Sequence, residues 1–171
     1  MTFTPTDLAG VFVVELAPVV DDRGFFARAF DPRAFAAQGL EAALPQTSLS
    51  FNTRRGTLRG MHFQRAPHEE VKLVRVVRGA IFDVALDLRP ESPTRYRWVG
   101  VELSADNRRA LYLPRGCAHG YQTLADDTEI LYQMTDTYHP EAAGGVRWDD
   151  PAFAITWPLA CLLYTSPSPR D

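Results

Sequence analysis

The feature that most constrains the fold is a series of short strand patterns between residues 57 and 136. In each segment apolar and β-branched residues alternate with polar ones, and turn-forming residues separate the segments. Arg78-Gly79 and Asp126-Asp127 are typical of tight hairpin turns, and Ser104-Ala105-Asp106-Asn107 is typical of a turn. Short strands at regular spacing predict a β-sandwich or a β-barrel. The predicted strands are 71–77, 80–88, 98–103, 109–114, 120–124 and 128–134.

One or two short helices are expected near the N-terminus of this otherwise all-β chain. Asp31 can cap a helix, Pro32 fits its first turn and Gly39 can end it. The length of 171 residues fits a single domain that can bury a core.

The alternation within the strands turns some charged residues inward. Asp83 and Asp87 share a face with apolar residues of their strand, and Lys72 does so in the strand before it. A buried charge is costly unless it is paired, so these residues either lie at strand ends in water or line a polar interior. A small barrel lined by Lys72, Asp83, His62 and Tyr132 would enclose a ligand pocket.

Composition excludes several classes of function. The net charge of −3 predicts no general attraction to nucleic acid or to an anionic membrane. We find no signal peptide and no apolar stretch near the ~20 residues of a membrane span. Cys117 and Cys161 have neither metal-site spacing nor a disulfide framework, so a cytoplasmic location is expected.

The last residues differ in character from the rest. Segment 161–171 matches one translated frame of a transposon-type sequencing adapter, and it has no strand or helix period. We therefore interpret 1–160 as the domain and 161–171 as a foreign, poorly packed tail.

The candidate chemistry centres on His62, in Gly56-Thr57-Leu58-Arg59-Gly60-Met61-His62-Phe63-Gln64. Lys72, Tyr132 and a second histidine, in Arg115-Gly116-Cys117-Ala118-His119-Gly120, complete the set. A base, a cation and a phenol are what proton transfer next to a carbonyl requires.

These motifs resemble the dTDP-4-dehydrorhamnose 3,5-epimerase family, whose fold is a cupin-type β-barrel (jelly roll). The resemblance covers nearly all of 21–158. The residues that carry it are Asp21-Asp22-Arg23-Gly24-Phe25-Phe26, the His62 motif, Lys72-Leu73-Val74-Arg75, Phe82-Asp83-Val84-Ala85-Leu86-Asp87-Leu88-Arg89, Trp98-Val99-Gly100-Val101-Glu102-Leu103, Ala118-His119-Gly120, Leu131-Tyr132 and Val146-Arg147-Trp148-Asp149-Asp150-Pro151.

The resemblance implies an epimerase of a dTDP-4-keto-6-deoxy sugar, in deoxysugar biosynthesis of the rhamnose type. His62 resembles the catalytic base, Tyr132 the proton donor on the opposite face, and Lys72 the cation that stabilises the enolate. The implied substrate-binding residues are Arg23 and Arg59 at the diphosphate, Tyr138 on the nucleotide base, and Phe26, Gln46, Ser48 and His119.

The resemblance also implies a homodimer, in which the aromatic region around Arg23, with Phe25, Phe26 and Phe30, pairs with the partner subunit. No cofactor or metal is expected, because the substrate's own ketone acidifies the neighbouring C–H, and the chain lacks a Gly-x-Gly-x-x-Gly fingerprint.

Some positions depart from the family pattern. The family commonly has Glu at Arg28 and at Ala143, and Gln-x-Asn where this chain has Gln46-Thr47-Ser48. The nucleotide therefore stays open, as does the choice between epimerisation at C3 alone and at both C3 and C5. The family's Asp that orients the catalytic His follows a Trp-Pro, and segment 161–171 stands in its place after Trp157-Pro158.

Two alternatives compete with this interpretation. A metal-dependent cupin enzyme needs a cluster of His and carboxylate ligands, and beside His62 only His119 is an obvious second ligand. His68 and His139 lie in Pro-flanked loops and are expected to face solvent. A non-catalytic sugar-nucleotide-binding cupin would need neither His62 nor Tyr132. Bound-metal analysis and proton exchange in heavy water distinguish the three.

Overall fold

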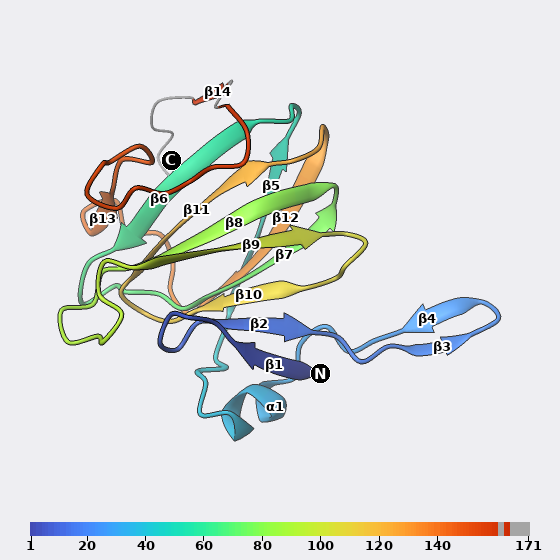
Figure 1. Cartoon of the computed structure of the whole chain (residues 1–171). Coiled ribbons are helices and arrows are strands. Elements are labelled where there is room, and N and C mark those ends of the chain that lie inside the picture. Colours follow the sequence, from blue (N-terminus) through green and yellow to red (C-terminus); the bar gives the residue numbers. More distant parts are fainter. Residues whose placement is uncertain (161–162, 165–171) are drawn as a thin grey trace.

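The computed structural model describes residues 1–160 and 163–164 and consists of two facing β-sheets (Figure 1). The first sheet has the order β1 (Thr2–Pro5), β2 (Phe12–Glu15), β10 (Ala110–Leu113), β7 (Lys72–Arg78), β12 (Thr128–Met134) and β5 (Gln46–Asn52). The second has the order β13 (Ala143–Gly145), β6 (Thr57–Gln64), β11 (Cys117–Thr123), β8 (Ala80–Asp87) and β9 (Trp98–Ser104).

The strand prediction is confirmed, but both predicted hairpins are wrong. β7 pairs with β10 and β12, whereas β8, directly after it, pairs with β11 and β9. β11 and β12 are likewise in different sheets. The turns at Gly79 and at 126–127 therefore carry the chain from one layer to the other. Gly79 has a φ of +77°, and a Cβ there would lie 2.4 Å from Thr128 Oγ1, which explains the glycine.

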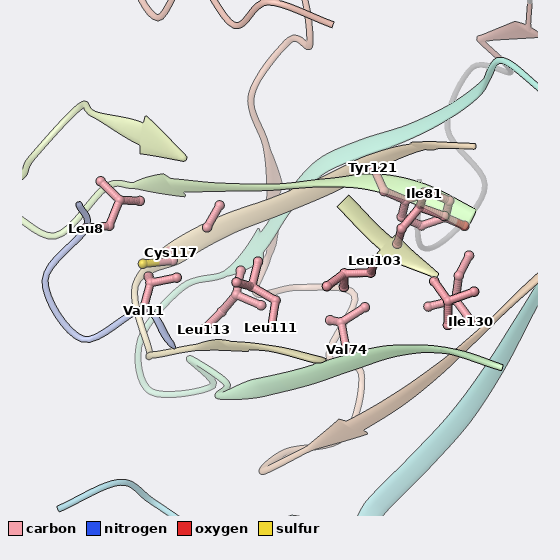
Figure 2. Packing of buried hydrophobic residues seen from close by; sticks show 12 residues of the cluster. Leu8, Val11, Val74, Ile81, Leu103, Leu111, Leu113, Cys117, Tyr121 and Ile130 are labelled. Atoms are coloured by element: carbon pink, nitrogen blue, oxygen red, sulfur yellow. The ribbon is translucent and has the colours of Figure 1, made fainter. Parts of the chain in front are cut away.

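A hydrophobic core occupies part of the space between the sheets (Figure 2). Val74, Leu111 and Ile130 of the first sheet are fully buried there together with Ile81 and Leu103 of the second. Among the described residues no strand pairing joins the two sheets, so they form a sandwich that is not closed into a cylinder.

The predicted N-terminal helix is confirmed as α1 (Pro32–Ala37). The Asp31 carboxylate accepts a hydrogen bond from the backbone N–H of Arg33 at 3.0 Å, and Pro32 occupies the first turn. Phe35 is buried against Phe3, Tyr112 and Phe30, at ring-centroid distances of 4.9, 5.9 and 5.0 Å. Phe30 thus belongs to this helix cluster and not to the exposed aromatic region in which it was predicted.

A two-stranded hairpin projects away from both sheets (Figure 1). It consists of β3 (Val19–Asp21) and β4 (Gly24–Phe26). Val19, Val20 and Phe26 are 72%, 73% and 78% exposed, so the hairpin presents an apolar surface that the rest of its own chain does not cover.

Most of segment 161–171 lies outside the described residues. Leu163–Tyr164 form a short strand, β14, that pairs in parallel with Thr57 and Leu58 of β6. The interpretation of the segment as a foreign tail stays a prediction. Within the described part of the chain, no helix combines the length and the apolar content that crossing a membrane requires.

Candidate active site

A cavity of about 860 Å³ opens between the two sheets. β5, β7 and β12 of the first sheet form one wall, and β6, β11 and β13 of the second form the other. The cavity brings together seven of the predicted site residues: Ser48, Arg59, His62, Lys72, His119, Tyr132 and Tyr138.

The two histidines lie opposite each other on neighbouring strands. His62 of β6 is the antiparallel partner of His119 of β11. The close approach of these strands depends on glycine, because a Cβ on Gly60 would lie 2.4 Å from Gly120 Cα.

His119 is held by a buried carboxylate. Its Nε2 lies 2.7 Å from Asp83 Oδ1, and Asp83 on β8 is fully buried. The other carboxylate oxygen, Oδ2, has no hydrogen-bond partner within the described part of the chain. The predicted inward orientation of Asp83 is confirmed, and its carboxyl group holds the ring of His119 in place.

Lys72 has a carboxylate partner that sequence reasoning missed. Its Nζ lies 3.2 Å from Glu70 Oε1, and the two side chains are only 10% and 11% exposed. The two-residue spacing in the sequence could have indicated this pair, because it puts Glu70 and Lys72 on the same face of an extended segment. The pair leaves an ammonium group at the cavity wall, where it can stabilise a developing negative charge.

Tyr132 lies on β12, and its ring packs against the His119 ring in a T-shaped arrangement at a centroid distance of 5.8 Å. Burial raises its pKa well above the ordinary value of 10, and the nearby Tyr121 and Asp83 add to this effect. The phenol therefore stays protonated at neutral pH, as a proton donor must.

Arg59 reaches the cavity from β6 and is positioned by groups that the sequence did not single out. Its Nε donates to Asn52 Oδ1 at 3.0 Å. The Tyr121 hydroxyl donates to the same oxygen at 3.3 Å and lies 3.0 Å from Ser50 Oγ. A cation held in this way is suited to bind an anionic group of a ligand.

The remaining predicted contacts do not line the cavity of this chain. Arg23 and Phe26 lie on the projecting hairpin, where the Arg23 side chain is 89% exposed and pairs with Asp21. Gln46 lies on β5, two residues before Ser48 and outside the lining. Arg28 forms an ion pair at 2.7 Å with Asp31, the N-cap residue of α1.

A two-sheet sandwich with a histidine, a lysine and a tyrosine around one cavity between its sheets is typical of a cupin-type enzyme. The dTDP-4-dehydrorhamnose 3,5-epimerase family model matches residues 5–171. The chain belongs to this family, and it is therefore a sugar-nucleotide epimerase of the isomerase class.

Individual relatives and a solved structure support the same family. A dTDP-4-dehydrorhamnose 3,5-epimerase from Methanothermobacter thermautotrophicus is 46% identical over 157 residues, which cover 92% of this chain and 84% of the relative. A dTDP-4-dehydrorhamnose 3-epimerase from Streptomyces niveus is 39% identical, covering 100% of this chain and 81% of the relative. The crystal structure of the 3,5-epimerase from Bacillus anthracis with TDP and PPi bound superposes with a TM-score of 0.90 at 38% identity, covering 93% of this chain and 91% of that one. The predicted family and cupin-type fold are confirmed.

Proposed function

We propose that this cavity binds a dTDP-4-keto-6-deoxy sugar and that His62 removes the proton next to its C4 ketone. A C–H beside a ketone is acidic because the resulting carbanion delocalises onto oxygen, and an imidazole has the basicity to remove it near neutral pH. The negative charge develops on the ketone oxygen, where the ammonium group of Lys72 stabilises it.

The observation that carries this proposal is the placement of base and acid on opposite walls. His62 belongs to the second sheet, whereas Tyr132 and Lys72 belong to the first. A sugar ring between the walls loses a proton to His62 on one face and receives one from the neutral Tyr132 phenol on the other. Return of the proton to the opposite face is what inverts the carbon.

The remaining contacts serve binding. Arg59 suits the diphosphate because its planar guanidinium binds oxygen atoms bidentately, and Tyr138 offers a ring on which the nucleotide base can stack. No redox cofactor enters, because the substrate already carries the ketone that acidifies its neighbours.

The experiment is incubation with dTDP-4-keto-6-deoxyglucose in heavy water, with deuterium read at C3 and C5. Deuterium at both carbons with inverted product assigns a 3,5-epimerase, and deuterium at C3 alone assigns a 3-epimerase. Absence of exchange at both carbons with tight binding retained would favour the non-catalytic binding protein. Exchange that a chelator abolishes and a divalent ion restores would favour the metal-dependent enzyme.

We also propose that the chain forms a homodimer through the β3–β4 hairpin. The exposed Val19, Val20 and Phe26 give this hairpin an apolar surface, and Arg23 on its turn would bring a second guanidinium to the partner's diphosphate. Sizing with light scattering at micromolar concentration tests this, with Phe26→Ser as the disrupting variant. A stable monomer in the unmutated protein contradicts it.

A cytoplasmic location fits the state of Cys117. This thiol is free and buried, and burial raises its pKa to about 12, so it is inert toward exchange. The described part of the chain, which contains Cys117, folds without a disulfide, and this suits a reducing compartment. Cell fractionation of the native host tests the location.

A further inference from the structure

A cluster of two histidines and an aspartate lies outside the catalytic cavity. His68 lies in the loop between β6 and β7, and Asp136 and His139 lie in the loop between β12 and β13. The imidazole rings stack at a centroid distance of 3.5 Å with an interplanar angle of 18°. The two histidine side chains, which were expected to face solvent, are partly exposed, at 30% and 27%.

The Asp136 carboxylate faces one nitrogen of each ring. Its Oδ2 lies 3.2 Å from His68 Nδ1, and its Oδ1 lies 3.6 Å from His139 Nε2. One ligand atom from each of the three residues can be chosen so that all lie within 4.8 Å of one another. In tetrahedral zinc sites with bonds near 2.0–2.1 Å, ligand atoms are about 3.3 Å apart. Metal binding would therefore draw the ligand atoms together and turn the two rings out of their stacked arrangement, because each nitrogen binds an ion in the plane of its own ring.

The buried side chain of Gln64 fixes the two loops to each other. Its Nε2 donates to the backbone carbonyls of His68 and Thr137, both at 3.0 Å, and its Oε1 accepts from the backbone N–H of His139 at 2.6 Å. The Thr137 N–H donates in turn to Asp136 Oδ1 at 2.7 Å. Hydrogen bonds from Gln64 and from the Thr137 backbone therefore hold the three side chains of the cluster near one another.

A second carboxylate contacts the other ring nitrogen of His139. Glu141 Oε1 lies 3.2 Å from His139 Nδ1, while Nε2 of the same ring lies 3.2 Å from Thr137 Oγ1 and 3.6 Å from Asp136 Oδ1. This is the arrangement found around metal-binding histidines, in which a carboxylate accepts from the far nitrogen, fixes the tautomer and raises the basicity of the near one.

We propose that His68, Asp136 and His139 bind a divalent transition metal ion of the zinc type, with Glu141 as the outer carboxylate. Two imidazoles and one carboxylate are the ligands that Zn²⁺ accepts, whereas Mg²⁺ and Ca²⁺ prefer oxygen alone. The ion would take no part in proton transfer. It would tie together two loops at the cavity, since Tyr138 of the second loop lines it and Glu70, two residues after His68, is the partner of Lys72.

The test is titration of the full chain with Zn²⁺ alone against a chromophoric chelator. Cys161, which lies outside the described residues, is replaced by serine so that its thiol cannot bind the ion. We expect one zinc ion per chain. Glu141→Gln should weaken zinc binding by about 10- to 100-fold, and His68→Gln, His139→Gln and Asp136→Asn should each weaken it more than that. His62→Gln, which removes an imidazole from the cavity and not from this cluster, should leave the affinity for Zn²⁺ unchanged.

A second measurement uses Co²⁺, whose visible absorption reports its coordination and disappears from the site when the imidazole ligands are removed. All variants are first compared with the parent by circular dichroism, and the exposed fractions of His68 and His139 predict folded proteins. Zinc binding as tight in the His68→Gln and His139→Gln variants as in the parent overturns the proposal, and so does the absence of one-to-one binding in the parent. Neither result bears on the epimerase activity, which the deuterium experiment tests separately.

Discussion

His62 and His119 are antiparallel partners on strands β6 and β11, and Nε2 of His119 lies 2.7 Å from Oδ1 of the buried Asp83. His119 is buried, whereas His62 is half-buried at the cavity wall. A fixed, enclosed imidazole suits orientation and hydrogen bonding, and a more accessible one suits proton removal from a ligand. The two histidines are therefore expected to differ in function although they share one wall of the cavity.

The first prediction concerns the base. His62→Ala should lose deuterium exchange at the sugar and product formation together, by about 10²- to 10⁴-fold, because removal of a general base stops the first step. Nuclear magnetic resonance of the sugar measures both, and binding of dTDP by calorimetry serves as the control for folding. Exchange at the parent rate would contradict the assignment of His62.

The second prediction separates the acid from the base. Tyr132→Phe keeps the ring and its packing but removes the proton donor, so deuterium exchange through His62 should continue while inverted product is lost. The ratio of exchange to product, measured in one sample, is the readout. Equal loss of both would mean that Tyr132 acts before or during proton removal.

The third prediction follows from the raised pKa of Tyr132. Because burial keeps the folded-state pKa above the unfolded value near 10, the neutral phenol is favoured by folding. Its contribution to stability is fully present below about pH 10 and is lost as the pH rises through the folded pKa. A tyrosinate absorbance titration of the parent minus Tyr132→Phe should place this ionisation above the ordinary range. Ionisation near pH 7 would rule out Tyr132 as the acid.

The fourth prediction uses two glycines with nearly the same backbone angle. Gly60 has a φ of +129° and Gly24 a φ of +130°, but a Cβ on Gly60 would lie 2.4 Å from Gly120 Cα, whereas one on Gly24 meets nothing within 4 Å. Gly24→Ala therefore measures backbone strain, and Gly60→Ala measures strain plus the clash between β6 and β11. We expect Gly60→Ala to lower the free energy of unfolding by about 1–3 kcal/mol more. Urea unfolding at one fixed protein concentration measures the difference, and equal losses would contradict this account of the strand contact.

Alternation along the strands predicted the inward faces well, because side-chain direction in a strand is a local property. Lys72 and Asp83 were placed correctly for that reason, and both are buried. The turns at Gly79 and at 126–127 were assigned to hairpins because turn residues specify that the chain reverses, but not whether the next strand pairs beside the last or in the opposite sheet. That choice depends on packing across the core, where distant strands such as β7 and β12 meet.

Sequence patterns did not predict the contacts between loops, because these contacts also depend on how distant parts of the chain pack. His68 and His139 are far apart in the chain, and contacts formed only on folding, such as the hydrogen bonds of Gln64, bring their loops together. Glu70 was missed although its spacing from Lys72 follows the strand period, because the period alone does not distinguish a buried partner from an exposed acid. Arg23 and Phe26 lie on a hairpin that leaves the domain, so a single chain does not bring them to the cavity.

The last prediction concerns acid stability and Asp87. Burial alone would raise the pKa of this carboxyl, but hydrogen bonds from Arg89, Ser92 and Thr94 outweigh burial and hold the pKa well below its ordinary value of 3.8. Because the folded-state pKa is depressed, the stabilisation is fully present above the unfolded value and is lost as the pH falls below about 4.

Asp87→Asn should therefore flatten the fall in unfolding free energy below pH 4. Asp87→Asn should also lower the free energy of unfolding at neutral pH by about 3 kcal/mol. This value is at the low end of the range for breaking a buried ion pair, because the Arg89 side chain is 26% exposed. Glu15→Gln, which removes the partner of Arg109 from a surface pair at 2.8 Å, is the matched control and should have little effect on either quantity. Urea unfolding from pH 7 to pH 2.5 measures both slopes. An acid slope in Asp87→Asn as steep as in the parent would show that other carboxylates determine the acid sensitivity of the fold.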